Sequence, residues 1–242
     1  MAYETLKRDV REANQNLYNL GLVKLTFGNV SARAPDGNIL IKPSGVNFSA
    51  LRDGDVVVVS PRGDVIECDS KNSRPSVDLS THLRIYRSFD EVGAVVHTHS
   101  PYSAGFAQAC IPIPCTGTTH ADFFNGNVPV ARLLSEEEVS SDYEGNTGKA
   151  IVETFTSGDI HPLDVPACLV PYHGAFVWGS NVHDAMKTAL ILEEVAKMES
   201  VRRTIAPGDV DGRIPDYLLR KHFVRKHGRK GEGYYGQGSG TK

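Results

Sequence analysis

Two β-hairpins near the start of the chain restrict the possible folds more than any other feature of the sequence. The first is predicted over Asn29–Arg33 and Asn38–Lys42, which flank a Pro-Asp-Gly turn. The second is predicted over Val56–Ser60 and Val65–Glu67, which flank a Pro-Arg-Gly-Asp turn. Because hairpins join antiparallel strands, the sheet that contains these segments is predicted to be mainly antiparallel.

Helical periodicity appears before and after the hairpins. Apolar residues recur every three or four positions up to Gly21, which is placed to end a helix. A second helix is predicted to begin near Ser76, and a short third helix at the capping-box sequence Ser135-Glu136-Glu137-Glu138. A long amphipathic helix is predicted over His183–Met198. Helices therefore alternate with strands along the chain.

Three further apolar segments are short enough to be strands: Val92–His97, Ala167–Pro171 and Ala175–Trp178. With the hairpins and helices they predict a single α/β domain of three layers, α/β/α, around a central mixed, mostly antiparallel sheet. A chain of 242 residues is long enough to bury one such core. We expect the domain to cover residues 1–237 and a glycine-rich, flexible tail to cover residues 238–242.

Charge and composition exclude several classes of partner. The formal net charge of −3 gives no basic field for nucleic acid or an anionic membrane. No stretch of about 18 uncharged apolar residues could span a bilayer, and the first residues lack the apolar run of a secretory signal. The four cysteines form no C-x-x-C pair and fit free thiols in a reducing compartment. We therefore expect a cytoplasmic protein that binds neither nucleic acid nor membrane.

The most specific local motif is His97-Thr98-His99, at the end of an apolar strand. Residues i and i+2 of a strand project from the same face, so both imidazoles can point at one ion. Pro101 stops the strand there, which places the pair at the rim of the sheet, where ligands commonly bind. Two converging imidazoles suit zinc or a similar divalent ion, although an isolated pair with this spacing also arises by chance.

Two histidines do not complete a catalytic metal site, so further ligands are needed. One candidate is His173, in a turn beside Gly174 between two short strands. Another is Asp78, in the first turn of the helix expected to begin at Ser76. The sequence does not show whether either side chain meets the histidine pair.

Three segments offer positions for a bound anion. Lys42-Pro43-Ser44-Gly45 ends a strand, and Gly45 lets a ligand approach the backbone closely. Gly28-Asn29 forms a similar corner, and Ser76 begins a helix whose free N–H groups favour negative charge. Each feature is common by itself. None matches a P-loop or a dinucleotide fingerprint, so a nucleotide-dependent enzyme is disfavoured.

Several of these motifs together resemble the class II aldolase and epimerase family. The matching segments are Leu25–Ala32, Ile41–Val46, Val96–Ser100 and Thr116–Asp122. Near the C-terminus, Lys221–Gly228 and Tyr234–Gln237 resemble the members of the family that epimerise L-ribulose 5-phosphate. The resemblance extends over nearly the whole chain, to about Gln237.

The resemblance implies the three-layer fold, a four-fold symmetric homotetramer with active sites between subunits, and zinc, or another divalent metal, as cofactor. The implied metal site consists of His97, His99 and His173, with Asp78 as a ligand or close neighbour. The implied acid/base pair is Asp122 and Tyr235. The positions that match phosphate-binding residues are Asn29, Lys42, Ser44, Gly45 and Ser76, and those that match other residues near the site are Thr118, Glu144, His222 and Arg225.

Two positions depart from the family pattern. Val77 stands where a serine often follows Ser76, which leaves only a backbone N–H for a phosphate. The stretch before Tyr234 is longer and richer in glycine than the family pattern leads us to expect.

The implied reaction interconverts L-ribulose 5-phosphate and D-xylulose 5-phosphate by breaking and remaking the C3–C4 bond. One alternative is a class II sugar-phosphate aldolase, such as one acting on L-fuculose 1-phosphate, which typically carries a glutamate where this chain has Asp78. The other is a non-catalytic interaction module on the same fold. The presence of the three histidines, Asp122 and Tyr235 argues against that module.

Overall fold

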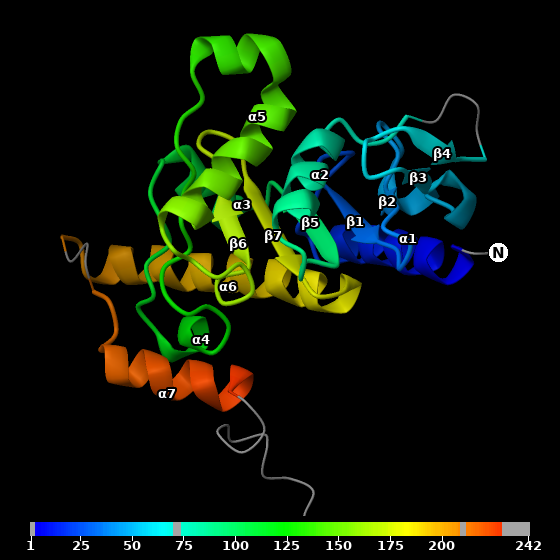
Figure 1. The fold of residues 1–242 in the computed structure, drawn as a ribbon. Helices are drawn as coiled ribbons and strands as arrows, with labels where there is room; N and C mark the ends of the chain where they lie inside the picture. Colours follow the sequence, from blue (N-terminus) through cyan, green and yellow to red (C-terminus); the bar gives the residue numbers. More distant parts are fainter. Residues whose placement is uncertain (1–2, 70–73, 209–211, 229–242) are drawn as a thin grey trace, which may run out of the picture.

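The computed structural model describes residues 3–69, 74–208 and 212–228 (Figure 1). Within them lies a seven-stranded sheet in the order β4-β3-β2-β1-β5-β7-β6. Its strands are β1 (Asn29–Arg33), β2 (Ile39–Ile41), β3 (Val57–Val59), β4 (Val65–Glu67), β5 (Ala94–Thr98), β6 (Ala167–Leu169) and β7 (Ala175–Gly179). All neighbouring strands pair antiparallel, and a parallel bridge joins Val130 to Leu169 at the β6 edge. The predicted sheet type is confirmed.

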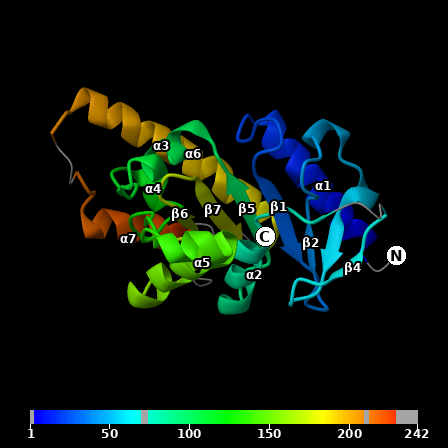
Figure 2. The same cartoon turned by 90° about the horizontal axis from the view of Figure 1, so that it is seen from above.

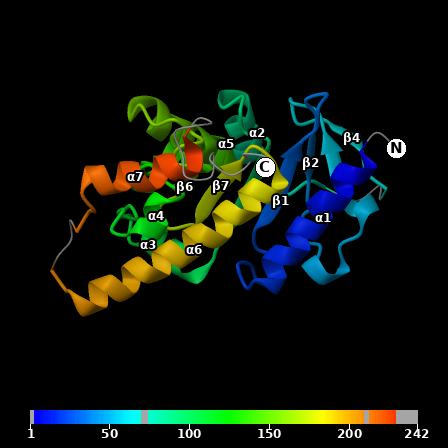
Figure 3. The same ribbon diagram turned by 90° about the horizontal axis from the view of Figure 1, so that it is seen from below.

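Helices cover both faces of the sheet, which confirms the predicted three layers. They are α1 (Glu4–Asn19), α2 (Leu79–Ser88), α3 (Pro101–Gln108), α4 (Thr118–Ala121), α5 (Glu136–Ser157), α6 (Val182–Ile205) and α7 (Asp216–His227), with 3₁₀ turns at η1 (Phe48–Ala50) and η2 (Asp53–Asp55). Helices α1, α3 and α6 lie on one face, and α2 and α5 lie on the other (Figures 2 and 3). The short α4 packs against α7 (Figure 1).

Local sequence explains most of these boundaries. Helix α1 buries Val10, Ala13 and Leu17 on one stripe and is followed by Gly21 in the left-handed conformation (φ 73°). Helix α5 begins at the predicted capping box, in which the Ser135 side chain accepts from the Glu138 N–H. That helix is long, with 22 residues, rather than short. Helices α3, α4 and α7 were not predicted.

Helix α2 begins later than predicted. It starts at Leu79, with Asp78 at the N-cap position, and not near Ser76. The Ser76 N–H donates to the Lys42 carbonyl at 3.0 Å, and Pro75 bridges to Pro43, so this segment pairs with the chain that follows β2. The expectation that Ser76 stands at a helix N-terminus with free N–H groups is therefore wrong.

The described residues share one buried apolar core, which extends along the chain from Val10 to Ala196. Phe89, Phe155 and Trp178 pack together in it, with ring centroids 5.1 to 5.8 Å apart. No helix among the described residues combines the length and the apolar character needed to cross a membrane. The predicted flexible tail at residues 238–242 lies outside the described residues.

Candidate metal centre

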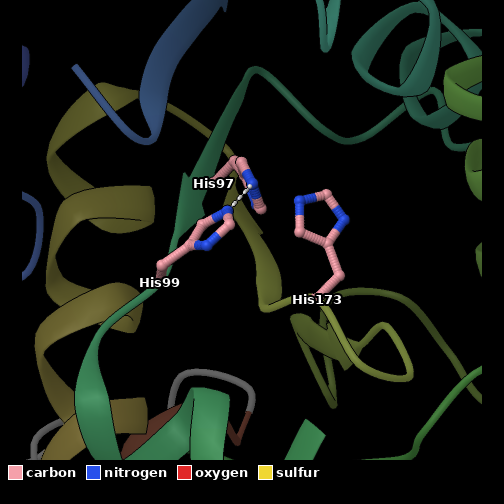
Figure 4. A group of neighbouring side chains, drawn as sticks. All are labelled: His97, His99 and His173. Carbon is pink, nitrogen blue, oxygen red and sulfur yellow. Dashed lines mark hydrogen bonds between the residues drawn. The ribbon is translucent and has the colours of Figure 1, made fainter. Parts of the chain in front are cut away.

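Three histidine rings converge at the ends of two neighbouring strands (Figure 4). His97 lies on β5, His99 follows that strand directly, and His173 lies in the turn between β6 and β7. Their ring centroids are 4.7 to 4.8 Å apart, and each pair of rings is inclined by 69 to 73°. One ring nitrogen from each lies within 4.8 Å of the others. The structure thus brings together the pair at the strand end and the distant candidate His173.

A close approach between backbone segments makes this convergence possible. A Cβ atom at Gly174 would lie 2.4 Å from the Thr98 carbonyl oxygen and 3.4 Å from ring atoms of His97 and His99. A side chain there would push the turn away from β5. Gly174 therefore lets the turn carry His173 against the other two rings.

Packing fixes the plane of the His97 ring. Its Nδ1 lies 3.0 Å from the Ala175 carbonyl oxygen, and an N–H at Nδ1 leaves the Nε2 lone pair free. The ring stacks on Phe176, its partner in β7, at a centroid distance of 4.2 Å and an angle of 15°. The Nε2 atoms of His97 and His99 are 2.9 Å apart. The two Nε2 atoms therefore lie close enough together to bind one ion.

Burial keeps these rings neutral. It lowers the pKa of His97 to about 3, against a smaller opposing effect of Asp78. Burial likewise lowers the pKa of His99 and of His173. Neutral imidazole nitrogen is the form that binds a divalent metal, and three such nitrogens suit a catalytic zinc site that keeps one position open. The donor set therefore fits the implied metal.

Asp78 lies beside the three histidines. Its Oδ2 accepts from the Asn29 amide at 2.6 Å and from the Ser76 hydroxyl at 3.3 Å. Burial alone would raise the pKa of Asp78, but its polar neighbours, among them the Asn29 amide that donates to it, hold that pKa below its usual value, so the carboxylate stays ionised. Among the described residues, the group placed to share one metal ion contains the three histidines without Asp78. In this geometry Asp78 is a charged neighbour of the site.

The candidate phosphate-binding residues lie next to this centre. Asn29 of β1 is the register partner of His97, and its amide donates to the Ser76 hydroxyl at 2.9 Å. The Lys42 side chain is buried, with its ammonium 4.7 Å from the centre of the Phe48 ring. Burial lowers the pKa of Lys42 to about 8, partly opposed by Asp78. A lysine with this pKa is still mostly charged at pH 7.

Backbone donors are scarcer here than expected. The Ser44 N–H donates to the Arg74 carbonyl at 2.9 Å, and the Ser76 N–H is also used. Gly45 is exposed, adopts a left-handed conformation (φ 72°) and has open space where a Cβ would be. Side-chain groups and the Gly45 backbone are therefore among the contacts that remain available for an anion.

Asp122 belongs to a second polar cluster. It follows α4, the helix that begins at Thr118, and its carboxylate accepts from Arg225 at 2.7 and 3.0 Å and from His222 at 2.9 Å. The Lys226 ammonium lies 3.5 Å away. None of these partners belongs to the three-histidine centre, so the described part of one chain holds two separate groups of predicted site residues.

Two predicted site residues remain, Glu144 and Tyr235. Glu144 lies in α5, where its carbonyl accepts from the Thr81 hydroxyl at 2.6 Å. Tyr235 lies outside the described residues. Sequence reasoning missed Tyr143, whose hydroxyl is 3.3 Å from His173 Nδ1, and Phe176 beneath His97. Phe176 could have been found by pairing the two apolar segments that became β5 and β7, which sets it opposite His97. No local signal in the sequence singles out Tyr143.

Comparison with known proteins defines the class. Residues 8–200 match the class II aldolase and adducin N-terminal domain family, and the chain belongs to this family. The resemblance seen in the motifs is thereby confirmed. The L-ribulose-5-phosphate 4-epimerase UlaF of Salmonella paratyphi A is 48% identical over 235 residues, which cover 97% of this chain and 99% of that protein. The protein of the same name from Salmonella typhi has the same identity and coverage.

Solved structures show the same fold at lower identity. An L-fuculose 1-phosphate aldolase aligns with a TM-score of 0.73 at 24% identity, over 88% of this chain and 92% of that chain. The L-fuculose 1-phosphate aldolase of Glaciozyma antarctica PI12 aligns with a TM-score of 0.72 at 19% identity, over 92% of this chain and 80% of that chain. Both likenesses support the three-layer architecture.

Proposed function

We propose that this chain is a zinc-dependent L-ribulose-5-phosphate 4-epimerase. The relatives that carry this name are 48% identical over nearly the full length of both chains. The observation that carries the proposal is the convergence of His97, His99 and His173, with neutral rings and one ring nitrogen each within 4.8 Å of the others. A centre of this kind suits a reaction that requires an electrophile beside a carbonyl group.

The chemistry explains why a metal is needed. The hydrogen at C4 of a ketopentose phosphate is not acidic, so direct proton abstraction cannot invert that carbon. Cleavage of the C3–C4 bond, rotation of the aldehyde fragment and re-addition to its other face can invert it. A zinc ion bound to the three histidines would supply the Lewis acid for this cleavage. The ionised Asp78 carboxylate would lie beside the positively charged zinc ion and so stabilise zinc binding.

Proton transfer is assigned to Asp122 and Tyr235. Inversion needs a proton to leave on one face of the sugar and to return on the other, which requires two groups. Asp122 is oriented by Arg225 and His222, and contacts none of the three histidines of its own chain. We therefore place the Asp122 cluster at the histidine centre of a neighbouring subunit in a homotetramer. The cytoplasmic location expected from the free cysteines belongs to the same proposal.

The phosphate group is assigned to the face formed by Asn29, Lys42, Ser44, Gly45 and Ser76. Hydrogen bonds to charged groups contribute about 1.5–3 kcal/mol each, so the phosphate should supply much of the substrate affinity. Unphosphorylated L-ribulose should then be a very poor substrate. Comparable kcat/KM values for the two sugars would contradict this assignment.

Product analysis tests the proposal against its two alternatives. The zinc-loaded protein is incubated with L-ribulose 5-phosphate, and the products are identified by NMR. Formation of D-xylulose 5-phosphate supports the epimerase. Accumulation of dihydroxyacetone and glycolaldehyde phosphate instead would indicate a simple aldolase, and an unchanged substrate would indicate a non-catalytic module.

A further inference from the structure

His173 lies in a turn, where no strand register fixes its ring. One ring nitrogen, Nε2, faces His97 and His99, and the other, Nδ1, points away from them (Figure 4). The hydroxyl of Tyr143 lies 3.3 Å from that Nδ1. We propose that Tyr143 is a positioning residue of the metal centre, which holds the His173 imidazole so that Nε2 points at the ion. This inference rests on the proposed metal-dependent function.

A kink in α5 presents Tyr143 to the centre. Asp142, directly before it, has non-helical dihedral angles (φ −143°, ψ 78°). The Asp142 carboxylate accepts from the Gly145 N–H at 3.1 Å and so caps a new helical segment that starts at Tyr143. A Cβ at Gly145 would lie 2.0 Å from an Asp142 carboxylate oxygen. Asp142 and Gly145 together therefore build the kink.

Contacts with α2 hold the kinked segment in place. The Thr81 hydroxyl donates to the carbonyl of Glu144, the residue after Tyr143. A Cβ at Gly148 would lie 2.7 Å from the Arg84 Cβ, so the two helices approach too closely for a larger side chain. Asp78 is the N-cap residue of the same α2. Tyr143 is thus carried by a rigid helix pair, as a positioning group requires.

The same arrangement already exists at His97. There the Nδ1–H donates to the Ala175 carbonyl and leaves Nε2 for the metal. When the Tyr143 oxygen accepts from the His173 Nδ1–H, it selects the matching tautomer. Metal-binding histidines generally donate their second ring N–H in this way, and loss of the acceptor costs about 10–100-fold in metal affinity or activity. Tyr143 touches a ligand and not the reacting atoms, so its role is to orient.

The variant Tyr143→Phe removes only the hydroxyl. We expect its zinc affinity, measured by competition with a chromophoric chelator, to fall by about 10–100-fold. The visible absorption spectrum of the cobalt-loaded variant should differ from that of the cobalt-loaded wild type, because the ligand field changes when His173 turns. The matched control is Tyr172→Phe, on the same turn, whose side chain is 70% exposed. It should keep the wild-type affinity and spectrum.

The outcomes separate this inference from the proposed function. If wild-type protein binds neither zinc nor cobalt, the proposed function fails. If wild-type protein binds both and Tyr143→Phe shows the same affinity and cobalt spectrum, only the role of Tyr143 fails. Thermal unfolding of the metal-free proteins completes the test. Weaker binding at an unchanged unfolding temperature supports positioning, whereas weaker binding that merely accompanies a lower unfolding temperature overturns it.

Discussion

Metal binding by the three histidines depends on where each ring nitrogen points and on the ring staying neutral. His97 satisfies both conditions through burial, the Ala175 carbonyl and the Phe176 ring. His99 and His173 satisfy the second through partial burial, which lowers the pKa of each. Neighbouring backbone and aromatic groups therefore determine the ligand geometry as much as the histidines themselves do.

Replacing His97 with Asn tests the ligand assignment. The shorter amide cannot place a nitrogen where Nε2 lies, so we expect the variant to lose most bound zinc and more than about 100-fold in turnover. Elemental analysis and circular dichroism measure the metal content and the fold. His183→Asn, at an exposed position on α6, is the control and should behave as wild type. Full zinc occupancy in the His97 variant would refute the assignment.

Gly174 should tolerate no side chain. The Cβ of Gly174→Ala would meet the Thr98 carbonyl oxygen, so we expect a loss of about 1–3 kcal/mol in the free energy of unfolding and weaker metal binding. Gly105→Ala is the matched control, because a Cβ there meets nothing within 4 Å and the position is helical. It should be neutral or slightly stabilising. Equal unfolding curves for the two variants would contradict the packing argument.

Helix α6 supports the segment that follows His99. The buried Glu193 carboxylate accepts from the Tyr102 and Ser103 N–H groups, both at 2.9 Å, at the start of α3. Glu193→Ala should cost about 2–4 kcal/mol in chemical denaturation, because one buried and one part-buried N–H group at the start of α3 lose a charged acceptor. The exposed neighbour Glu194→Ala should change stability by less than about 0.5 kcal/mol.

Asp122 should anchor α7 in a pH-dependent way. Burial would raise its pKa, but hydrogen bonds from Arg225 and His222 and the charge of Lys226 lower it below the ordinary value of 3.8. A carboxylate with a lowered folded-state pKa stabilises the contact above its unfolded pKa, and this stabilisation is lost as pH falls through the folded value. Asp122→Asn should therefore expose α7 to trypsin at pH 7, where the ionised Asp122 of the wild type keeps the helix anchored. The control variant Asp159→Asn, at an exposed position, should leave α7 as resistant to trypsin as in the wild type.

The sequence predicts individual helices and strands better than it predicts how they pack and pair with one another. Strands β1 and β4 begin and end where predicted, because turn residues bound them clearly. Helix α3 was missed because Pro101 indicated only the end of a strand, although proline also suits a first helical turn. The kink at Asp142 was not predicted: Asp142 and Gly145 build it locally, and the contact with α2 that holds it in place leaves no local pattern in the sequence. His173 was a candidate by residue type, and only the β5–β7 pairing brings it to His97.

Buried neutral histidines should make the fold as a whole sensitive to acid. Burial lowers the pKa of His82 and of His120 to about 4 each. In the unfolded chain these histidines take up protons near pH 6.5, whereas in the folded protein they do so only near pH 4. The free energy of unfolding is therefore unaffected by them above pH 6.5 and falls as the pH drops toward 4. The loss at pH 5 is on the order of 2 kcal/mol per histidine. His120→Gln should flatten the decline in unfolding temperature between pH 7 and 5, and an unchanged slope would contradict this.

Epimerisation should depend on a metal held by the three-histidine centre. A titration of metal-free protein with zinc tests this dependence, with the rate of D-xylulose 5-phosphate formation from L-ribulose 5-phosphate recorded after each addition. We predict no activity without metal, a rate that rises linearly with added zinc, and no further rise beyond one zinc ion per chain. A full rate in the metal-free protein, or binding of one zinc ion per chain that leaves the rate at zero, would contradict the account.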